Sequence, residues 1–384
     1  MKIRTILNLL LLHVFSCSNG LALERTEYLI SGLEPGSLKT ALTQCAAGPL
    51  RVTDFSISHR GAPMGYPEHS KEGYLAAIKM GAGLIECDVV LTKDRQLVCR
   101  HSQCDLHRTT NVLQTDLASQ CQVPFAPGDG HRRVKARCCT NDFTLAQLRG
   151  LCARRDVVND RAQSVDQYLL QGLPSQRLAQ NECGTLLSHR ESIQLISNSK
   201  RKHIPELKKM SGTGLRALGV SVEEYADMLV AEYRDFDISP DRVYLQSFDQ
   251  NVVNYWLEAY PDYASKVVFL DGRGRRPGFR ASRADMDSLY EGGLRVIAPP
   301  IPMLLEVNGQ GGLRKTDYAT YAVDAGLDLI TWTFDSRLSE IAGFSREESD
   351  GLRVLDALNK EARVRGVFSD WPEVVTRYAN CMNL

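Results

Sequence analysis

The sequence lacks three features that would each have suggested a particular function. It has no excess of either charge, with 46 basic and 46 acidic residues, so nothing in its overall charge favours binding to nucleic acid. It has no C-x-x-C pair, the spacing typical of structural zinc sites. It also has no apolar run of the roughly 20 residues that a helix needs to span a bilayer, so we expect no stable membrane span.

The N-terminus resembles an export signal. Lys2 and Arg4 lie near the start of the chain, an apolar run follows over residues 6–15, and Gly20-Leu21-Ala22 forms an A-x-A-like cleavage site. We therefore expect residues 1–22 to be a signal peptide and residues 23–384 to be the mature, exported chain, either periplasmic or secreted. Lipoprotein anchoring at Cys17 is the alternative, although the bulky residue two positions before it fits a lipobox poorly.

The cysteines support export. The chain has 11 cysteines, and removal of the signal peptide leaves an even number, as expected where disulfides form. Six of the remaining ten lie within about residues 103–184, a long irregular stretch. The cysteine density predicts an ordered insertion held by disulfides, with the pairing left open.

Outside that stretch, short strands alternate with helices. Strands are expected at residues 54–59, 84–91, 202–208, 243–248, 266–270, 295–298, 328–333 and 366–369. Residues 96–101 should extend the second strand as a hairpin, and Ser188 with Glu191 forms a capping box for a later helix. Eight strand–helix units favour a closed TIM (β/α)8 barrel in one domain, with an open doubly wound sheet as the alternative.

Carboxylates occur at unusual places in these strands. Residues i and i+2 of a strand point to the same face, so Glu86 and Asp88 project together. Two carboxylates in an apolar strand repel each other unless a cation or a proton separates them, and a hard divalent metal is a natural solution. Glu206 could complete a three-carboxylate site, and Lys208 could hold a phosphate oxygen. Each motif alone is weak, because single acidic and basic residues are usually solvated.

The strand ends also hold two histidines. His59 and Arg60 follow the first strand, and His101 ends the hairpin arm. Histidine titrates near neutrality, which suits it to proton transfer.

Together these residues resemble the glycerophosphodiester phosphodiesterase family, in its periplasmic and secreted branch with a large insertion after the second histidine. The matching segments are 57–62, 67–70, 85–89, 91–94, His101, 106–111, 205–208, 246–249, 332–333 and 368–372. The resemblance implies a TIM barrel with its active site at the C-terminal face of the strands. It also implies metal-dependent hydrolysis of glycerophosphodiesters, such as glycerophosphocholine, to sn-glycerol 3-phosphate and an alcohol, within lipid and glycerol metabolism.

The family's roles transfer to particular residues here. Glu86, Asp88 and Glu206 would bind the metal, and His59 and His101 would act as general acid and base, in an order left open. The substrate would contact Arg60, Lys208 and Trp332. The family usually has Asp after the second histidine, where this chain has Ser102, so the tuning of His101 stays open.

Export favours Ca²⁺ as the metal, since it is abundant outside cells and accepts flexible carboxylate ligation, with Mg²⁺ as the alternative. Two other functions remain open: a phospholipase-type phosphodiesterase, resembling sphingomyelinase D or phosphoinositide-specific phospholipase C, and a non-catalytic binding protein on the same barrel. The expected partner is a small-molecule substrate. The sequence does not indicate an oligomeric state.

Overall fold

A computed structural model describes residues 25–129, 131–170, 183–335 and 340–384. The expected signal peptide, residues 1–22, lies outside the described residues. Within them, no helix has both the length and the apolar character needed to cross a membrane.

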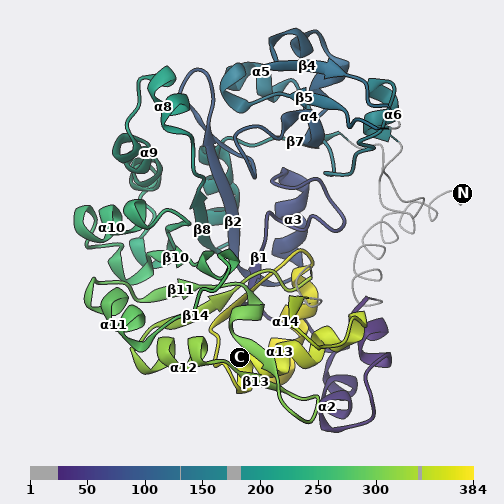
Figure 1. Cartoon of the computed structure of the whole chain (residues 1–384), viewed down its shortest axis with the longest axis vertical. Coiled ribbons are helices and arrows are strands. Elements are labelled where there is room, and N and C mark those ends of the chain that lie inside the picture. The colour runs from purple at the N-terminus through teal and green to yellow at the C-terminus, as the bar shows by residue number, and fades with distance from the viewer. Residues whose placement is uncertain (1–24, 130, 171–182, 336–339) are drawn as a thin grey trace, which may run out of the picture.

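Eight parallel strands form a closed barrel (Figure 1). In spatial order they are β1 (Thr53–Ser58), β15 (Gly366–Ser369), β14 (Asp328–Thr331), β11 (Val296–Ala298), β10 (Val268–Leu270), β9 (Gln246–Ser247), β8 (Lys202–Leu207) and β2 (Ala82–Leu91). Because β1 pairs in parallel with both β15 and β2, the sheet has no open edge. The TIM barrel prediction is therefore confirmed, and the open doubly wound sheet is excluded.

Helices follow the strands and cover the outside of the barrel (Figure 1). They are α3 (Lys71–Lys79), α7 (His189–Asn198), α8 (Gly212–Leu218), α9 (Val222–Asp235), α10 (Gln250–Ala259), α11 (Arg283–Glu291), α12 (Asp317–Asp324), α13 (Gly351–Lys360) and α14 (Pro372–Met382). The predicted capping box opens α7, since the Ser188 hydroxyl accepts from the Glu191 amide and the Glu191 carboxylate accepts from the Ser188 amide.

The structure contains the predicted hairpin arm, but one of the predicted strands is shorter than expected. The hairpin arm is present as β3 (Leu97–Cys99), antiparallel to β2. The strand expected at 243–248 is shorter, because only Gln246–Ser247 form its regular ladder while Val243 makes an isolated bridge to His203. A second hairpin, β12 (Leu305–Val307) with β13 (Leu313–Lys315), lies between β11 and α12.

The cysteine-rich stretch is folded and lies at one end of the molecule, at the top of Figure 1. Its elements are α4 (Leu106–Thr109), β4 (Val123–Ala126), β5 (Lys135–Arg137), α5 (Leu145–Arg149), β6 (Cys152–Ala153), α6 (Val165–Leu170) and β7 (Gly184–Thr185). Its small apolar core, around Phe143 and Leu148, also includes Val90 of β2 and Val98 of β3.

Five disulfides pair the ten cysteines that follow residue 22. Three of them lie in the insertion: Cys104–Cys139, Cys121–Cys138 and Cys152–Cys183. Cys45–Cys381 joins α2 (Ser37–Cys45) to α14, and Cys87–Cys99 joins β2 to β3. The disulfide-stapled insertion is therefore confirmed.

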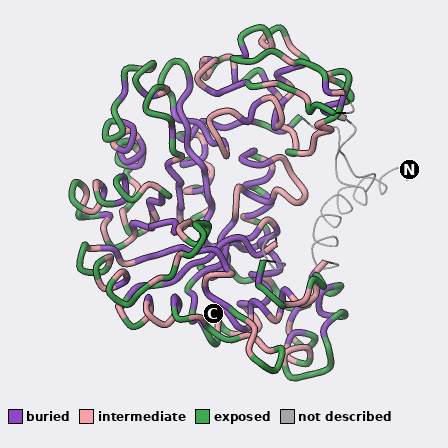
Figure 2. The backbone as a smooth tube through the Cα atoms, in the orientation of Figure 1, coloured by how far each residue is buried: buried purple, intermediate pink, exposed green. Residues whose placement is uncertain are grey.

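The barrel has two apolar layers. The larger one packs the outer face of the strands against the helices, and the smaller one fills the barrel interior. Figure 2 shows the buried backbone concentrated along the barrel strands. Interior residues such as Ile57, Leu84 and Ile204 lie on the N-terminal side of the polar residues on β1, β2 and β8. This apolar floor places the polar groups at the C-terminal ends of the strands.

Candidate active site

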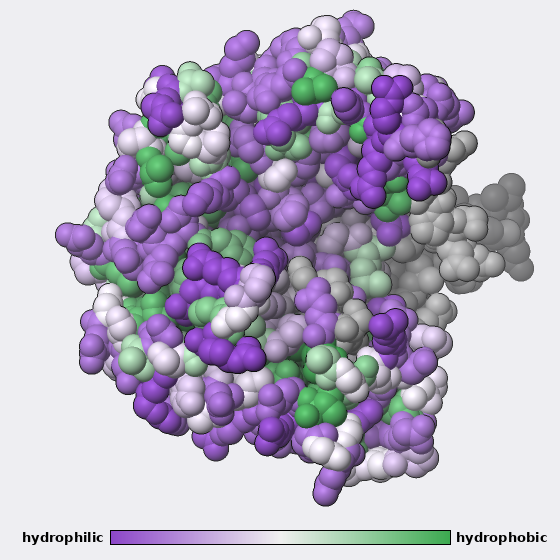
Figure 3. Space-filling model, in the orientation of Figure 1, coloured by the Kyte–Doolittle hydropathy of each residue, from purple (hydrophilic) through white to green (hydrophobic). Residues whose placement is uncertain are grey.

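The predicted site residues meet at one cavity of about 470 Å³. Seven of the eight line it: His59, Arg60, Glu86, His101, Glu206, Lys208 and Trp332. The eighth, Asp88, lies with Glu86 and Glu206 in the acidic cluster described below. Figure 3 shows mostly hydrophilic surface where the insertion, at the top of the view, meets the barrel below it.

The turn after β1 requires unusual backbone geometry. Arg60 has a φ of 56° and Gly61 a φ of 91°. A Cβ on Gly61 would lie 2.9 Å from the backbone of Gly73, so a larger residue does not fit there. The turn directs the Arg60 amide to the carboxylate of Glu86, at 2.9 Å. The glycine of the His-Arg-Gly segment thus allows the backbone to contact the acidic cluster.

Glu86, Asp88 and Glu206 form this cluster. Each offers a carboxylate oxygen, and these oxygens lie within 4.8 Å of one another. The reason is strand geometry, since Glu86 and Asp88 share a face of β2 and Asp88 is paired with Glu206 in the β2–β8 register. All three residues are buried.

Most of the carboxylate oxygens have protein partners. Glu86 accepts from the Gln246 side-chain amide at 2.9 Å, in addition to the Arg60 amide. Glu206 pairs with the Lys208 ammonium at 2.8 Å. Asp88 Oδ2 accepts from His69 Nε2 at 3.0 Å, whereas its buried Oδ1 has no hydrogen-bond partner within the described residues.

Burial and mutual repulsion perturb these carboxylates strongly. Burial, followed by the charges of Asp88 and Glu206, raises the pKa of Glu86 well above its ordinary value. Burial likewise raises the pKa of Glu206 to about 7, although Lys208 opposes the shift. Burial also acts to raise the pKa of Asp88, but Lys208 and His69 outweigh it and hold that pKa well below the usual range. The raised pKa values of Glu86 and Glu206 show that the three carboxylates crowd one another despite the nearby Lys208.

The donor set fits a divalent cation. Hard cations such as Ca²⁺ and Mg²⁺ take oxygen ligands, and three converging carboxylates supply them. The unpartnered Oδ1 of Asp88 is a buried acceptor of the kind that a bound cation would satisfy.

His69 supports this cluster from behind. It is fully buried, and its Nδ1 accepts from the Tyr74 hydroxyl at 3.0 Å while its Nε2 donates to Asp88. Metal-binding carboxylates commonly have such outer partners, which fix their orientation. The residue was within a matched segment of the sequence, but its role required the fold, because Asp88 lies 19 positions away.

His59 has a carboxylate partner. Its Nδ1 donates to Asp370 Oδ1 at 2.5 Å, which fixes the ring and leaves Nε2 available for chemistry. Asp370 follows β15, the strand beside β1 in the barrel. Behind it, Asp335 accepts from the Asp370 amide at 2.6 Å. No role for either aspartate was predicted from the sequence.

Unlike His59, His101 has no carboxylate partner in the part of the chain that the structure describes. It makes no side-chain hydrogen bond within the described residues, and burial, followed by the charge of Arg60, lowers its pKa to about 3. Ser102, which replaces the family's usual Asp, donates its amide to Asp105. His101 is therefore positioned by the β3 arm rather than by a neighbouring carboxylate, and its uncharged form is favoured.

Buried ion pairs surround Arg60. Its guanidinium pairs with Glu68 at 3.1 Å and approaches Asp88 at 3.7 Å. Burial acts to lower the pKa of Arg60, but Glu68 and Asp88 outweigh it and raise the pKa above its ordinary value. Arg100, 1% exposed, lies 3.5 Å from Glu68 on the other side. Arg60 thus remains a fixed positive charge at the cavity.

Aromatic rings form another wall. Trp332, which follows β14, donates its indole N–H to the Ala298 carbonyl at 2.8 Å. Phe248, which follows β9, contacts it edge to face with ring centroids 5.5 Å apart. Arg275 lies over both rings and lines the cavity, a position that the sequence analysis did not anticipate.

A TIM barrel with an acidic cluster, two histidines and fixed basic groups at the C-terminal ends of its strands is suited to metal-assisted hydrolysis of a phosphate ester. Comparison identifies the family. Residues 59–374 match the family model described as the glycerophosphoryl diester phosphodiesterase family. The chain belongs to this family and is a glycerophosphodiester phosphodiesterase.

Three known proteins illustrate what this chain is similar to. An "Extracellular protein" of Arthroderma benhamiae is 37% identical over 246 residues, which are 60% of this chain and all of that protein. A glycerophosphodiester phosphodiesterase of Arabidopsis thaliana is 31% identical over 112 residues, 28% of each chain. An Oleispira antarctica phosphodiesterase, solved with its product sn-glycerol-3-phosphate, has a TM-score of 0.53 at 17% identity, over 88% of this chain and 99% of that one. At that identity the likeness supports the fold alone.

Proposed function

We propose that this enzyme hydrolyses glycerophosphodiesters to sn-glycerol 3-phosphate and an alcohol, using one divalent cation held by Glu86, Asp88 and Glu206. The convergence of these carboxylates with two histidines in one cavity is the observation that supports it. The product bound to the Oleispira antarctica phosphodiesterase is consistent with this reaction. Ca²⁺ is the proposed ion and Mg²⁺ the alternative.

The basic residues hold the phosphodiester. Arg60 and Lys208 face the cavity as fixed charges that attract the two non-bridging phosphoryl oxygens. Trp332 offers an apolar face to the glycerol moiety. A bound cation would supply Lewis-acid stabilisation of the charge that develops on the phosphoryl oxygens.

Two proton transfers complete the hydrolysis. The oxygen of a water molecule forms a bond to phosphorus while the bond from phosphorus to the alcohol oxygen breaks. His101, whose uncharged form is favoured, accepts the proton from water. His59, whose ring is oriented by Asp370, donates a proton to the departing alcohol oxygen.

The test is release of sn-glycerol 3-phosphate from several glycerophosphodiesters by the purified mature protein. Glu86→Gln and Asp88→Asn should each abolish release and lower the bound metal, as measured by elemental analysis. Glu258→Gln, an exposed acid on α10, is the matched control and should retain full activity. Undiminished hydrolysis by either site variant, or in the presence of EDTA, would contradict the metal assignment. Faster cleavage of sphingomyelin or phosphatidylinositol would instead favour a phospholipase-type enzyme.

We also propose that the enzyme is exported and that residues 1–22 are removed. The five disulfides and the extracellular relative support this proposal. The N-terminal sequence of the protein recovered outside the cell should begin at residue 23. A lipid-modified N-terminus at Cys17 would contradict it.

A further inference from the structure

One basic group at the cavity has no acidic partner. Four lysine and arginine side chains line the cavity, and three of them pair with carboxylates. These pairs are Arg60–Glu68 at 3.1 Å, Lys208–Glu206 at 2.8 Å and Lys209–Asp249 at 3.2 Å. Arg275 has no ion pair or side-chain hydrogen bond to any of the residues that the structure describes, and its side-chain contacts are with aromatic rings. Its guanidinium donors are therefore available to a ligand.

The aromatic wall holds Arg275 at the cavity. Its guanidinium carbon lies 5.2 Å from the ring centroid of Trp332 and 5.9 Å from that of Phe248. Stacking on aromatic faces favours arginine and leaves its N–H groups, which lie in the guanidinium plane, free to donate. The turn that places Arg275 follows β10, so the position is set by the barrel.

This arrangement affects which substrates can enter. A quaternary ammonium group binds best against the faces of aromatic rings. At this cavity the Arg275 guanidinium lies over the rings of Phe248 and Trp332, and its positive charge repels a second cation. A carboxylate or phosphate would instead meet an unpaired fork of donors.

We propose that Arg275, held by Phe248 and Trp332, is a specificity-determining residue that binds a second anionic group of the substrate. The proposal rests on the function proposed above and narrows its substrate class. Glycerophosphodiesters whose alcohol bears a phosphate or carboxylate are preferred, and those that bear a quaternary ammonium are poor substrates.

The test compares three substrates of the purified mature enzyme. Glycerophosphoinositol 4-phosphate and glycerophosphoinositol differ by one phosphate, and glycerophosphocholine bears the quaternary ammonium. The wild-type enzyme should show a kcat/KM about tenfold higher for the first substrate than for either of the others. Arg275→Gln should remove most of this preference, mainly through KM, and Arg275→Glu should reverse it.

Arg276→Gln is the matched control, because Arg276 is the exposed neighbour and does not line the cavity. It should leave the preference unchanged. An equal loss of kcat/KM on all three substrates in Arg275→Gln would overturn the proposal, and so would an unchanged preference or a wild-type preference for glycerophosphocholine. Failure of the wild type to hydrolyse any of them would contradict the proposed function instead. Equilibrium binding of glycerophosphoinositol 4-phosphate, weakened about tenfold by Arg275→Gln, would then still test the subsite.

Discussion

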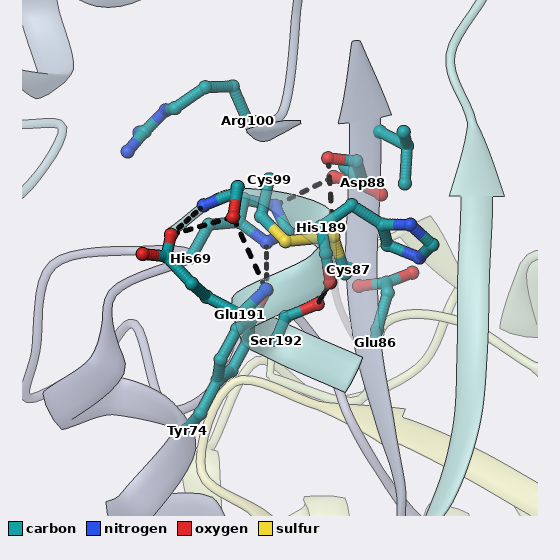
Figure 4. Close-up of a disulfide and its surroundings, with 12 residues drawn as sticks. His69, Tyr74, Glu86, Cys87, Asp88, Cys99, Arg100, His189, Glu191 and Ser192 are labelled. Carbon is teal, nitrogen blue, oxygen red and sulfur yellow. Dashed lines mark hydrogen bonds and ion pairs between the residues drawn. A yellow bond between two sulfur atoms is a disulfide. The ribbon is translucent and has the colours of Figure 1, made fainter. Parts of the chain in front are cut away.

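Cys87 and Cys99 form a disulfide that fastens the strand of the acidic cluster to the arm of the second histidine. Cys87 lies between Glu86 and Asp88 on β2 (Figure 4), and Cys99 lies two residues before His101 in the sequence. Because strand residues alternate between faces, both sulfur atoms belong to the outer apolar layer and the carboxylates belong to the cavity side. The disulfide thus connects the two parts of the site without entering it.

Replacement of both cysteines by alanine should lower kcat by about tenfold, because a small displacement of His101 impairs proton transfer. Metal content should stay unchanged. The free energy of unfolding should fall by about 3 kcal/mol, as expected for removal of a short closed loop. The double variant Cys121→Ala, Cys138→Ala is the control, since it removes a disulfide from the insertion alone. If kcat survives the first double variant while stability falls, the disulfide has no positioning role.

His69→Gln should weaken binding of the divalent cation by about 10–100-fold, because Asp88 loses the group that orients it. Tyr74→Phe should cause a smaller loss in the same direction, since the Tyr74 hydroxyl fixes the proton of His69 on Nε2. Calorimetric titration with Ca²⁺ and Mg²⁺ measures both effects. Tyr28→Phe, at a residue 64% exposed, serves as the control. Unaltered affinity in His69→Gln would show that His69 does not orient Asp88 for the cation.

Asp370→Asn should lower kcat by about 10²-fold while metal affinity is retained, because the carboxylate that accepts from His59 Nδ1 and orients the ring is lost. Asp370→Glu should recover part of kcat by restoring the charge. A kcat in Asp370→Asn equal to that of the wild type would show that this carboxylate does not position His59.

Buried His203 should make the fold sensitive to acid. It is 0% exposed, and burial, followed by the charges of His189 and Arg242, lowers its pKa to about 3. An unfolded histidine has a pKa of about 6.5, so the unfolded chain binds more protons between these two values. Stability is therefore complete above pH of about 6.5 and is lost as the pH falls toward 3, by up to about 1.4 kcal/mol per pH unit.

Urea unfolding of His203→Gln across this pH range should show a shallower dependence of the free energy of unfolding on pH. His131→Gln, in the exposed part of the insertion, is the comparison. Identical slopes in the wild type and in His203→Gln would show that His203 does not cause the acid sensitivity.

Local patterns in the sequence predicted much of this protein. Alternation of strands and helices predicted the barrel, since each unit buries its apolar face in the same way. The i, i+2 spacing of Glu86 and Asp88 predicted their common face, because side-chain direction in a strand is a local property. The count of ten cysteines after residue 22 predicted the presence of disulfides but not their pairing.

Only the tertiary structure decided which distant groups meet. His59 and Asp370 are 311 positions apart and come together because β1 and β15 pair where the barrel closes. Arg275 lies over Trp332 because the turns after β10 and β14 converge at the same end of the barrel. The sequence thus determined the fold class and the acids of the site. The pairing of His59 with Asp370 and the position of the Arg275 guanidinium depend on closure of the barrel, which no local pattern in the sequence encodes.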